Sequence, residues 1–454
     1  MTVAELVGMF EERRPVAVMA QSVLERLLDP AEIDPLFHDT AERQYERELL
    51  FSSLARLMSE VVLCRAKSVR AAYGNVRDEL GVSLTAIYAK LERIEPELSQ
   101  ALVRYSYGEL VRVTNELRAY EPSPVAGLRP KILDGNQFGA TEHRLLETRN
   151  STAAPLPGKA LVVLDPRREA IADLFPIADG HAQERTWLDP VIETFERNDL
   201  WIADRNFCTL KLLYSAARRG ARFVVRLHAQ LHGEPLGKRR LVGETATGRC
   251  YETTLRLPTY DGETLTVRAV ELELFKPTRD DDATLVILTN LTAAEADGAR
   301  VTEIYRGRWR IETAFQRLTT ELHCELRTLC YPKAAIFTFA LACLAYNAVS
   351  LVLAAIRAEH GRKEAESLSF HALGTEIAQT YDGLMVAIPA THWRRVRELP
   401  LAEFAASLRA TARRMDLSYY RKVRRRPRKP KPKPVHDPKI VHVSIQRILE
   451  RRKH

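Results

Sequence analysis

A run of short apolar segments between residues 131 and 228 constrains the fold of this chain more than any other feature of its sequence. Five of these segments have the length and composition of strands: KILD (131–134), ALVVLD (160–165), EAIADLF (169–175), LWIAD (200–204) and ARFVVRLH (221–228). Helical periodicity separates the last three, over residues 184–197 and in TLKLLYSAARRG (209–220). This order of strands and helices predicts an α/β fold, in which a mixed sheet carries helices on its faces.

This order of strands and helices is that of a ribonuclease-H-like sheet. The regions before and after it have different patterns of apolar and polar residues. Residues 1–118 have helical periodicity throughout, and the segment EPSPVAGLRP that follows them indicates a domain boundary. Alternating apolar and polar residues predict a mostly β insertion before a helical stretch at 293–327. The expected organisation is a helical N-terminal region at 1–120, an α/β catalytic domain at 125–228 and 292–360, a β-rich insertion at 229–291, a C-terminal helical region at 361–420 and a basic tail, expected to be disordered, at 421–454.

The positive charge of the chain is concentrated near its C-terminus. The formal net charge is +9, and RKVRRRPRKPKPKP (421–434) alone contains nine Arg or Lys residues and no acid. The rest of the chain is therefore close to neutral, so a polyanion would be contacted by the tail and by local patches. Counterion release would give such a tail affinity for DNA with little choice of sequence.

The cysteines and one long apolar segment indicate in which cellular compartment the protein is expected. None of the six cysteines forms a C-x-x-C pair, which argues against a zinc ribbon and favours a reducing cytosol. The N-terminus lacks the apolar stretch of a secretory signal. Residues 334–356 are uncharged and long enough to cross a bilayer. However, Thr338, Asn347 and Ser350 interrupt them, which favours a helix buried in a large core. We therefore expect a cytoplasmic protein without a membrane span.

Two aspartates follow apolar strands that the predicted topology places side by side. Asp134 ends KILD and Asp204 ends LWIAD. Either residue alone is equally well explained as a turn residue or a helix N-cap. Asp165 also ends a strand, but that strand is expected to run antiparallel to the first, so Asp165 is interpreted as a turn residue.

A third acid lies on the helix expected after the insertion. In IYRGRWRIETAFQRL, Tyr305, Arg308 and Glu312 share one helical face. An apolar stripe that includes Ile311 and Leu318 would dock this helix on the sheet. The alternative is an amphipathic helix with an Arg308–Glu312 surface pair. Trp309 is expected to pack between helix and sheet.

Phosphodiester chemistry has a use for three carboxylates in this arrangement. Two Mg²⁺ ions, about 3.5–4 Å apart, can activate the attacking oxygen and stabilise the leaving oxygen of an in-line displacement. Mg²⁺ prefers oxygen ligands and keeps several waters, so a few carboxylates and the substrate phosphate suffice. The sequence contains no convincing Ser/His/Asp or Cys/His constellation, no Walker loop and no G-x-G-x-x-G motif.

ILDGN, IADRNF and YRGRWRIE resemble the three signature regions of DDE transposases of bacterial insertion sequences. The similarity is greatest to the insertion-sequence-four-like branch, whose catalytic Glu lies in a Y-x2-R-x3-E-x6-K signature after a β insertion. The resemblance covers residues 40–360 approximately. It implies that Asp134, Asp204 and Glu312 are catalytic and bind two Mg²⁺ ions per active site, for which Mn²⁺ can substitute. It also implies that Tyr305 and Arg308 place DNA phosphates beside the metals.

The resemblance further implies cut-and-paste transposition by a DNA-bridged homodimer. Water would cleave the element end, and the freed 3′-hydroxyl would then attack; a hairpin-ended intermediate is usual in this branch. The expected partners are double-stranded DNA at the terminal inverted repeats and at the target, in a cytoplasmic, nucleoid-associated protein. Recognition of the ends would fall to the N-terminal helical region. Arg306 and Arg310, beside the active face, are candidates for contact with the DNA backbone.

Thr319 stands where the signature has its Lys. Thr can hydrogen-bond a phosphate but brings no charge. His323 is expected on the same face one turn later, either as a partial replacement or as an ordinary exposed histidine. This departure keeps open a non-catalytic, domesticated DNA-binding relative. A structure-selective nuclease on the same fold is a third reading; the complete Y-R-E helix and the β insertion favour a transposase over it.

Overall fold

The predicted strands join one continuous sheet in the structure, a computed structural model that describes residues 2–44, 48–278, 281–423 and 441–453. The strands that carry the centre of the sheet are β4 (Ala170–Ile177), β3 (Lys159–Asp165), β1 (Arg129–Gln137), β5 (Asp199–Ala203) and β6 (Arg222–Arg226), in that spatial order. β1 pairs antiparallel with β3 and parallel with β5, and β5 pairs parallel with β6. All five predicted strands are thus confirmed, and this mixed α/β arrangement is consistent with a ribonuclease-H-like fold.

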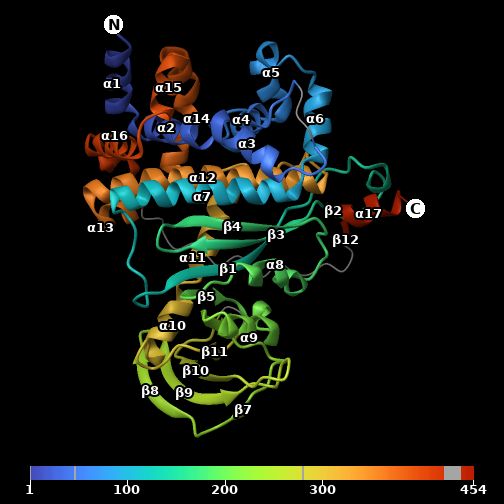
Figure 1. The fold of residues 1–454 in the computed structure, drawn as a ribbon, viewed down its shortest axis with the longest axis vertical. Coiled ribbons are helices and arrows are strands. Elements are labelled where there is room, and N and C mark those ends of the chain that lie inside the picture. The colour runs from blue at the N-terminus through green and yellow to red at the C-terminus, as the bar shows by residue number, and fades with distance from the viewer. Residues whose placement is uncertain (1, 45–47, 279–280, 424–440, 454) are drawn as a thin grey trace.

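The β-rich region extends this sheet instead of forming a separate unit. β11 (Thr284–Thr289) pairs antiparallel with β6, and its other edge continues the sheet. The remaining strands of this part are β10 (Thr266–Leu274), β9 (Gly248–Arg256), β8 (Arg240–Thr245) and β7 (Glu234–Pro235). The predicted β character of this region is confirmed, and Figure 1 shows it as the lower end of the molecule.

Helices from both ends of the chain form one layer over the β4 side of the sheet (Figure 1). The N-terminal helices are α1 (Val3–Arg13), α2 (Pro15–Leu27), α3 (Pro30–Thr40), α4 (Phe51–Val62), α5 (Val69–Leu80), α6 (Leu84–Arg93) and α7 (Pro96–Leu117). The C-terminal helices are α13 (Arg362–Ser367), α14 (Phe370–Ala387), α15 (Ala390–Arg397) and α16 (Leu401–Arg413). Because α14 and α15 pack on α2, and α16 packs on α7, the two helical regions expected as separate share one core.

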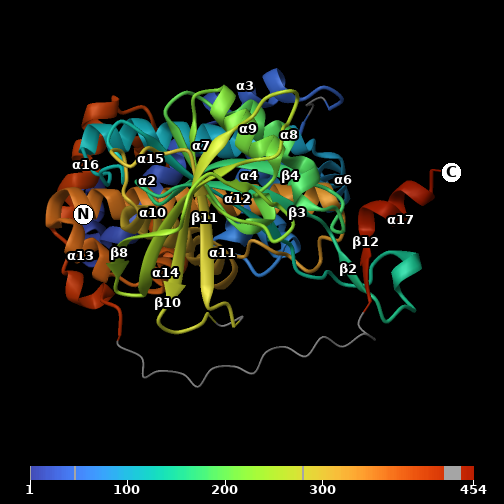
Figure 2. The ribbon, with the colours of Figure 1, turned by 90° about the horizontal axis from the view of Figure 1, so that it is seen from below.

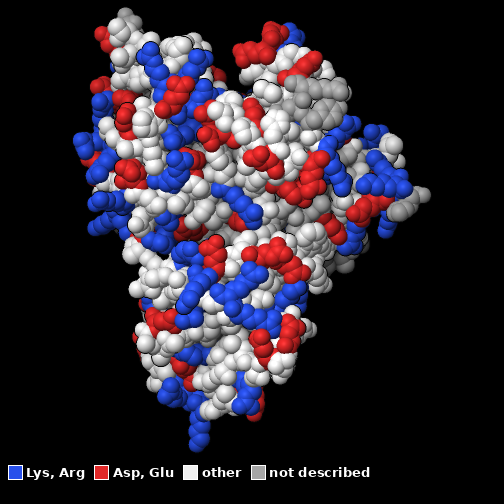
Figure 3. All heavy atoms as spheres, in the orientation of Figure 1, with Lys and Arg blue, Asp and Glu red and all other residues white. Residues whose placement is uncertain are grey.

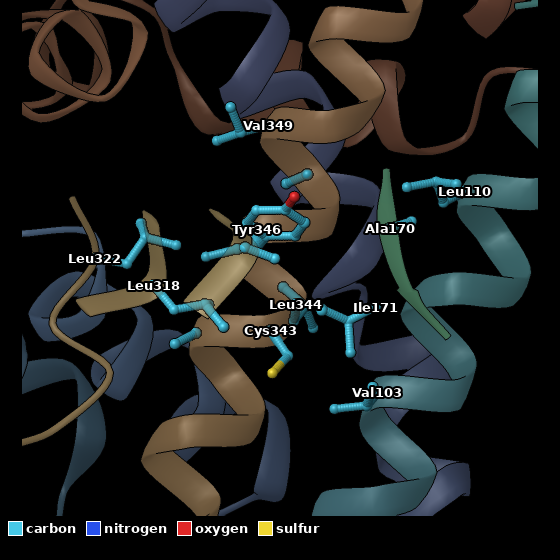
Figure 4. Packing of buried hydrophobic residues seen from close by; sticks show 14 of the residues in the cluster. Val103, Leu110, Ala170, Ile171, Leu318, Leu322, Cys343, Leu344, Tyr346 and Val349 are labelled. Atoms are coloured by element: carbon cyan, nitrogen blue, oxygen red, sulfur yellow. The ribbon is translucent and has the colours of Figure 1, made fainter. Parts of the chain in front are cut away.

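The uncharged segment forms α12 (Pro332–His360), which lies beside α7 in the helical layer, and both helices pack on β4. By length and composition it could cross a membrane, but its most apolar stretch is entirely buried within the protein. Figure 4 shows Ile171 of β4 directed towards Leu344 of α12, with Val103 and Leu110 on the adjacent α7. The expectation that this segment is a buried core helix agrees with that packing.

The opposite face of the sheet is covered by short helices. α8 (Leu188–Glu193) and α9 (Leu210–Arg218) pack on a second apolar cluster that includes Leu133 and Trp201. The single helix predicted over residues 184–197 is wrong: a 3-10 turn, η2 (Glu184–Trp187), precedes a much shorter α8. Pro190 lies in the first turn of α8, where its missing N–H is tolerated, and it prevents the helix from starting earlier.

The end of the chain also differs from the expectation of a disordered tail. Residues 424–440, which hold most of the basic run, lie outside the described residues. After them, β12 (His442–Ser444) pairs in parallel with β2 (Ala154–Leu156), and α17 (Ile445–Arg451) follows (Figure 2). Ile445 is fully buried against Leu145 and Cys330, so the apolar side chains of HVSIQRIL hold this segment on the rest of the protein. The prediction of disorder is therefore wrong for 441–453.

Candidate active site

The register of the sheet brings Asp134, which lies within β1 and not at its end as predicted, next to Asp204, which directly follows β5. Leu133 of β1 lies beside Ala203 of the parallel strand β5, so Asp134 and Asp204 follow at neighbouring positions. Side chains alternate between the two faces of a strand. Ile132 faces the main core and Leu133 the second cluster, so Asp134 points to the main-core side, as Asp204 does by the same count.

The third acid approaches from that same side, on a helix that is interrupted. Instead of one helix over 293–327, α10 (Gly298–Arg306) and α11 (Trp309–Thr320) are separated by Gly307 and Arg308. The N–H of Arg308 donates to the carbonyl of Tyr305, a tight i to i−3 bond of a 3-10 turn. A glycine destabilises a helix interior, which favours the break at this point. The prediction of a continuous helix is thus wrong.

Arg308 connects two of the three acids directly. Its Nη1 donates to Asp134 Oδ2 at 2.7 Å and its Nη2 to Glu312 Oε1 at 2.6 Å. The Arg308 side chain is only 10% exposed, and its Nε is buried without a hydrogen-bond partner among the described residues. Burial lowers the pKa of Arg308, but the adjacent Asp134, Tyr305 and Asp204 outweigh it, so the pKa lies above its ordinary value. The guanidinium is therefore a permanent positive charge between the carboxylates.

Asp204 is tied to the same cluster by a tyrosine. The hydroxyl of Tyr305 donates to Asp204 Oδ1 at 3.4 Å, and the N–H of Arg205 donates to the same oxygen at 2.6 Å. Burial and the charge of Asp204 raise the pKa of Tyr305 to about 12, so its hydroxyl stays protonated at neutral pH. The signature residues Tyr305, Arg308 and Glu312 thus converge with both aspartates, although Tyr305 lies on α10, Glu312 on α11 and Arg308 in the turn between them.

Among the three acids, Asp134 has a pKa that its surroundings clearly shift. Burial raises its pKa to about 6, and the neighbouring Asp204 and Glu312 add to that rise. Arg308 and the N–H of Gly135, which donates to Asp134 Oδ1 at 2.9 Å, act in the opposite direction. The carboxylates are therefore close enough to repel one another, as expected of groups that gain a shared cation.

The donor set fits a hard divalent cation. Three carboxylates are the ligand type that Mg²⁺ takes, and the Arg308 guanidinium already holds positive charge between two of them. In the present arrangement, no three acidic, His or Cys side chains among the described residues are grouped closely enough to hold one ion. Arg308 fills the position between Asp134 and Glu312, which accounts for that spacing.

Two of the candidate DNA-binding residues lie away from this cluster. Thr319 lies two turns along α11 from Glu312, and its hydroxyl donates to the carbonyl of Phe315 at 2.9 Å. His323 was expected on the same helical face, but α11 ends at Thr320, so that placement is wrong. His323 is exposed, and its backbone N–H donates to the carbonyl of Val62.

The residues on either side of Arg308 have different surroundings. Arg306 is exposed and, with Trp309, lines a cavity of about 520 Å³ between α10 and the strands β10 and β11. Trp309 is 62% exposed, so the expectation that it packs between helix and sheet is wrong. Arg310 Nη1 donates to the carbonyl of Pro166 at 2.6 Å, which fixes it at the turn after β3. Asp165 accepts from Tyr107 and Arg168, as a turn residue does.

A fourth carboxylate, which the sequence analysis did not single out, lies beside Gly135 of β1 and the turn after β5. Glu184, the first residue of η2, accepts a hydrogen bond from Asn206 Nδ2 at 2.7 Å. Asn206 belongs to η3 (Arg205–Phe207), the turn that follows Asp204. The motif IADRNF contained Asn206, but no periodicity in the sequence connects it to Glu184.

Part of the chain matches a known family. Residues 158–348 match the model of the family described as the transposase DDE domain. The matched range contains Asp204, Tyr305, Arg308 and Glu312 and begins after Asp134. No curated protein matches the chain in sequence. The family match supports a transposase of the DDE class.

The face of the molecule seen in Figure 3 carries both signs of charge. Figure 3 shows Lys and Arg side chains interspersed with Asp and Glu on the visible face, without a single uniform basic field. This distribution agrees with the near-neutral charge of the chain outside its basic run. Contacts to a polyanion therefore have to come from local groups of residues.

Proposed function

We propose that this protein is an insertion-sequence transposase of the insertion-sequence-four-like branch, which excises and inserts its element by metal-dependent cleavage and strand transfer. The observation that carries the proposal is the gathering of Asp134, Asp204 and Glu312 around Arg308 and Tyr305. The three acids lie within β1, directly after β5 and on α11, and these elements are far apart in the sequence. A structural salt bridge would not require the third acid or the tyrosine.

The three acids would hold two Mg²⁺ ions, which when bound supply an activated oxygen nucleophile and stabilise the leaving oxygen. Arg308 has to leave the space between Asp134 and Glu312 before both carboxylates can serve as ligands. Its released guanidinium, with five N–H donors, suits a DNA phosphate beside the acids. Tyr305, which stays protonated, can donate its hydroxyl to the same phosphodiester.

The partners under this proposal are the terminal inverted repeats of the element and a target duplex, held by a DNA-bridged dimer in the cytoplasm. The basic run at 421–434 would add affinity for DNA that falls with salt concentration. Under the same proposal Arg306, which is exposed beside Tyr305, would contact the backbone of a bound strand. Sequence-specific recognition is assigned to the N-terminal helices.

A non-catalytic DNA-binding relative is the second candidate, and Thr319 favours it. The hydroxyl of Thr319 is bonded to the carbonyl of its own helix, and it supplies no charge in place of the signature Lys. All three acids are nevertheless present, as is Arg308 between them. The transposase therefore remains the better-supported function.

The test uses purified full-length protein, Mg²⁺ or Mn²⁺, and DNA that carries the sequences flanking the coding region together with a target plasmid. The wild-type protein is expected to cleave at the element ends and join them to the target. E312Q should bind the same DNA with unchanged affinity but lose cleavage by a factor of at least ~10³, since a required metal ligand is lost. E303Q, an exposed glutamate of α10 that pairs with Arg300, is the matched control and should retain activity.

The outcomes separate the candidate functions. End cleavage with insertion supports the transposase, and binding without cleavage by the wild-type protein supports the non-catalytic relative. Nicking of unrelated branched DNA without insertion supports a nuclease. Full cleavage by E312Q would remove Glu312 from the mechanism.

A further inference from the structure

Glu184 lies where the two chain segments that carry the aspartates separate from each other. β5 ends at Ala203, and the chain turns through η3, whereas β1 continues along β3 to Gln137. The two segments therefore separate directly after Asp134 and Asp204. A contact that joins the two segments at this point therefore adds to the β1–β5 pairing in setting the spacing of the two aspartate carboxylates.

One carboxylate contacts both segments. Oε2 of Glu184 accepts the hydrogen bond from Asn206, two residues after Asp204. The same carboxylate is packed against Gly135, directly after Asp134: a Cβ atom at Gly135 would lie 2.2 Å from Glu184 Oε1 and 2.4 Å from its Cδ. Only a glycine leaves room for the carboxylate at this distance. Gly135 has an ordinary negative φ, so the requirement for glycine comes from space and not from backbone conformation.

Glu184 acts from the opposite face of the sheet to the aspartates. The absent Cβ of Gly135 would point away from the side on which Asp134 lies, because side chains alternate along a strand. Glu184 reaches that face from η2, which precedes α8. It is half-buried, and no Lys or Arg among the described residues forms an ion pair with it. Within the described residues, the hydrogen bond that Asn206 donates is thus the polar contact of the Glu184 side chain. A hydrogen bond to a carboxylate is stronger than one between two neutral groups.

We propose that Glu184 is a positioning residue of the active site, which clamps Gly135 and Asn206 and thereby sets the distance between Asp134 and Asp204 for metal binding. This inference rests on the proposed function. It assigns to Gly135 the role of making room for the clamp and to Asn206 the role of its second contact. Outer residues that orient metal ligands typically change metal affinity by about 10–100-fold when removed.

The test measures Mn²⁺ affinity of the full-length, DNA-free protein by calorimetry or by the electron paramagnetic resonance signal of free Mn²⁺. E184A is expected to weaken Mn²⁺ binding at least ~10-fold. E184Q keeps an oxygen that can accept from Asn206 and should recover affinity to within about threefold of the wild type. N206A should weaken binding like E184A, and the double variant should weaken it little further, because both changes break one contact.

The glycine provides an independent variant with a matched control. G135A places a methyl group where the Glu184 carboxylate lies, so it should also weaken Mn²⁺ binding ~10-fold. G108A, in α7, has open space around the added methyl and should bind as the wild type does. The melting temperature of each variant is measured without metal, so that a loss of affinity in a stably folded variant is not confused with unfolding.

D134N distinguishes failure of this inference from failure of the proposed function. If D134N abolishes Mn²⁺ binding while E184A, N206A and G135A bind as the wild type does, the clamp is wrong and the metal site stands. Wild-type affinity in D134N would overturn the metal site, and the clamp with it. Weak binding by E184Q, equal to that of E184A, would also contradict a role carried by the hydrogen bond.

Discussion

At the scale of single residues, the site combines groups that would destabilise the protein if they stood alone. Asp134 is buried beside two further carboxylates, and Arg308 compensates for this with a guanidinium that is itself buried and whose Nε has no hydrogen-bond partner within the described part of the chain. Such groups are retained where they bind something else. The metal-free site is therefore expected to cost stability.

The raised pKa of Asp134 makes that cost depend on pH. Its pKa of about 6 in the folded protein exceeds the ordinary value of 3.8, so the folded state binds its proton more tightly than the unfolded state does. The contribution of Asp134 to stability is therefore most favourable below pH 4 and is lost as pH rises through about 6. D134N should be more stable than the wild type at pH 8 by about 1–3 kcal/mol.

Urea unfolding in the presence of a chelator, at pH 4.5 and at pH 8, measures this difference. The advantage of D134N should shrink at the lower pH, where the wild-type carboxyl gains its proton. An advantage that stays constant or grows at low pH would contradict the raised pKa. D165N is the control. Asp165 accepts hydrogen bonds from Tyr107 and Arg168 outside the site, so this change should destabilise the protein instead of stabilising it.

The residue scale also shows what sequence reasoning can reach. Asp134, Asp204 and Glu312 were identifiable because strand ends and helical spacing are local properties of the sequence, and the structure brings all three to Arg308 and Tyr305. Glu184 could not be found in this way. Its contacts to Gly135 and Asn206 depend on how η2 returns to the sheet, which no periodicity encodes.

At the scale of elements, α12 fixes the sheet to the helical layer through a buried amide. β4 is the edge strand of the sheet, and the side chain of Asn347 occupies that edge. The N–H of Ile171 donates to Asn347 Oδ1 at 2.8 Å, and Asn347 Nδ2 donates to the carbonyl of Ile171 at 2.9 Å and to Ser106 Oγ at 3.0 Å. One side chain thus replaces a neighbouring strand, which explains a fully buried Asn in an otherwise apolar helix.

Replacing this amide should destabilise the protein strongly. N347L leaves both backbone groups of Ile171 buried without a partner, at a cost of about 2–5 kcal/mol in the free energy of unfolding. S350A removes one hydrogen bond, to the carbonyl of Glu169, and should cost about 1 kcal/mol. Chemical denaturation monitored by circular dichroism measures both changes. An N347L protein as stable as the wild type would show that the amide is not required at this edge.

Elements were predicted best where their signal was local. The five central strands were found from their apolar composition, because each is buried on both faces. The helix predicted at 184–197 failed at Pro190, and the helix at 293–327 failed at Gly307, two residues whose backbone chemistry breaks a helix despite suitable periodicity. The docking of β12 on β2 depends on a partner far away in the sequence and could not be inferred from composition.

At the scale of the whole molecule, the fold brings together segments that are remote along the chain. Arg308 and Asp134 are 174 residues apart, and the β7–β11 region lies between Asp204 and Glu312 in the sequence. That region extends the central sheet, so its position relative to the acids is fixed by hydrogen bonds between β6 and β11. The helical layer packs on the main-core face of the central strands. The site is therefore held between the helical layer and the β7–β11 region, and both contribute to one core.

The central claim is that acids from these remote segments share cations, and a crystal soaked in Mn²⁺ tests it most directly. Anomalous difference density is expected within about 2.5 Å of carboxylate oxygens of Asp134, Asp204 and Glu312. The Arg308 guanidinium should then have moved out of the space between Asp134 and Glu312. Bound Mn²⁺ found only elsewhere, with Arg308 still bonded to both acids at saturating metal, would contradict the account.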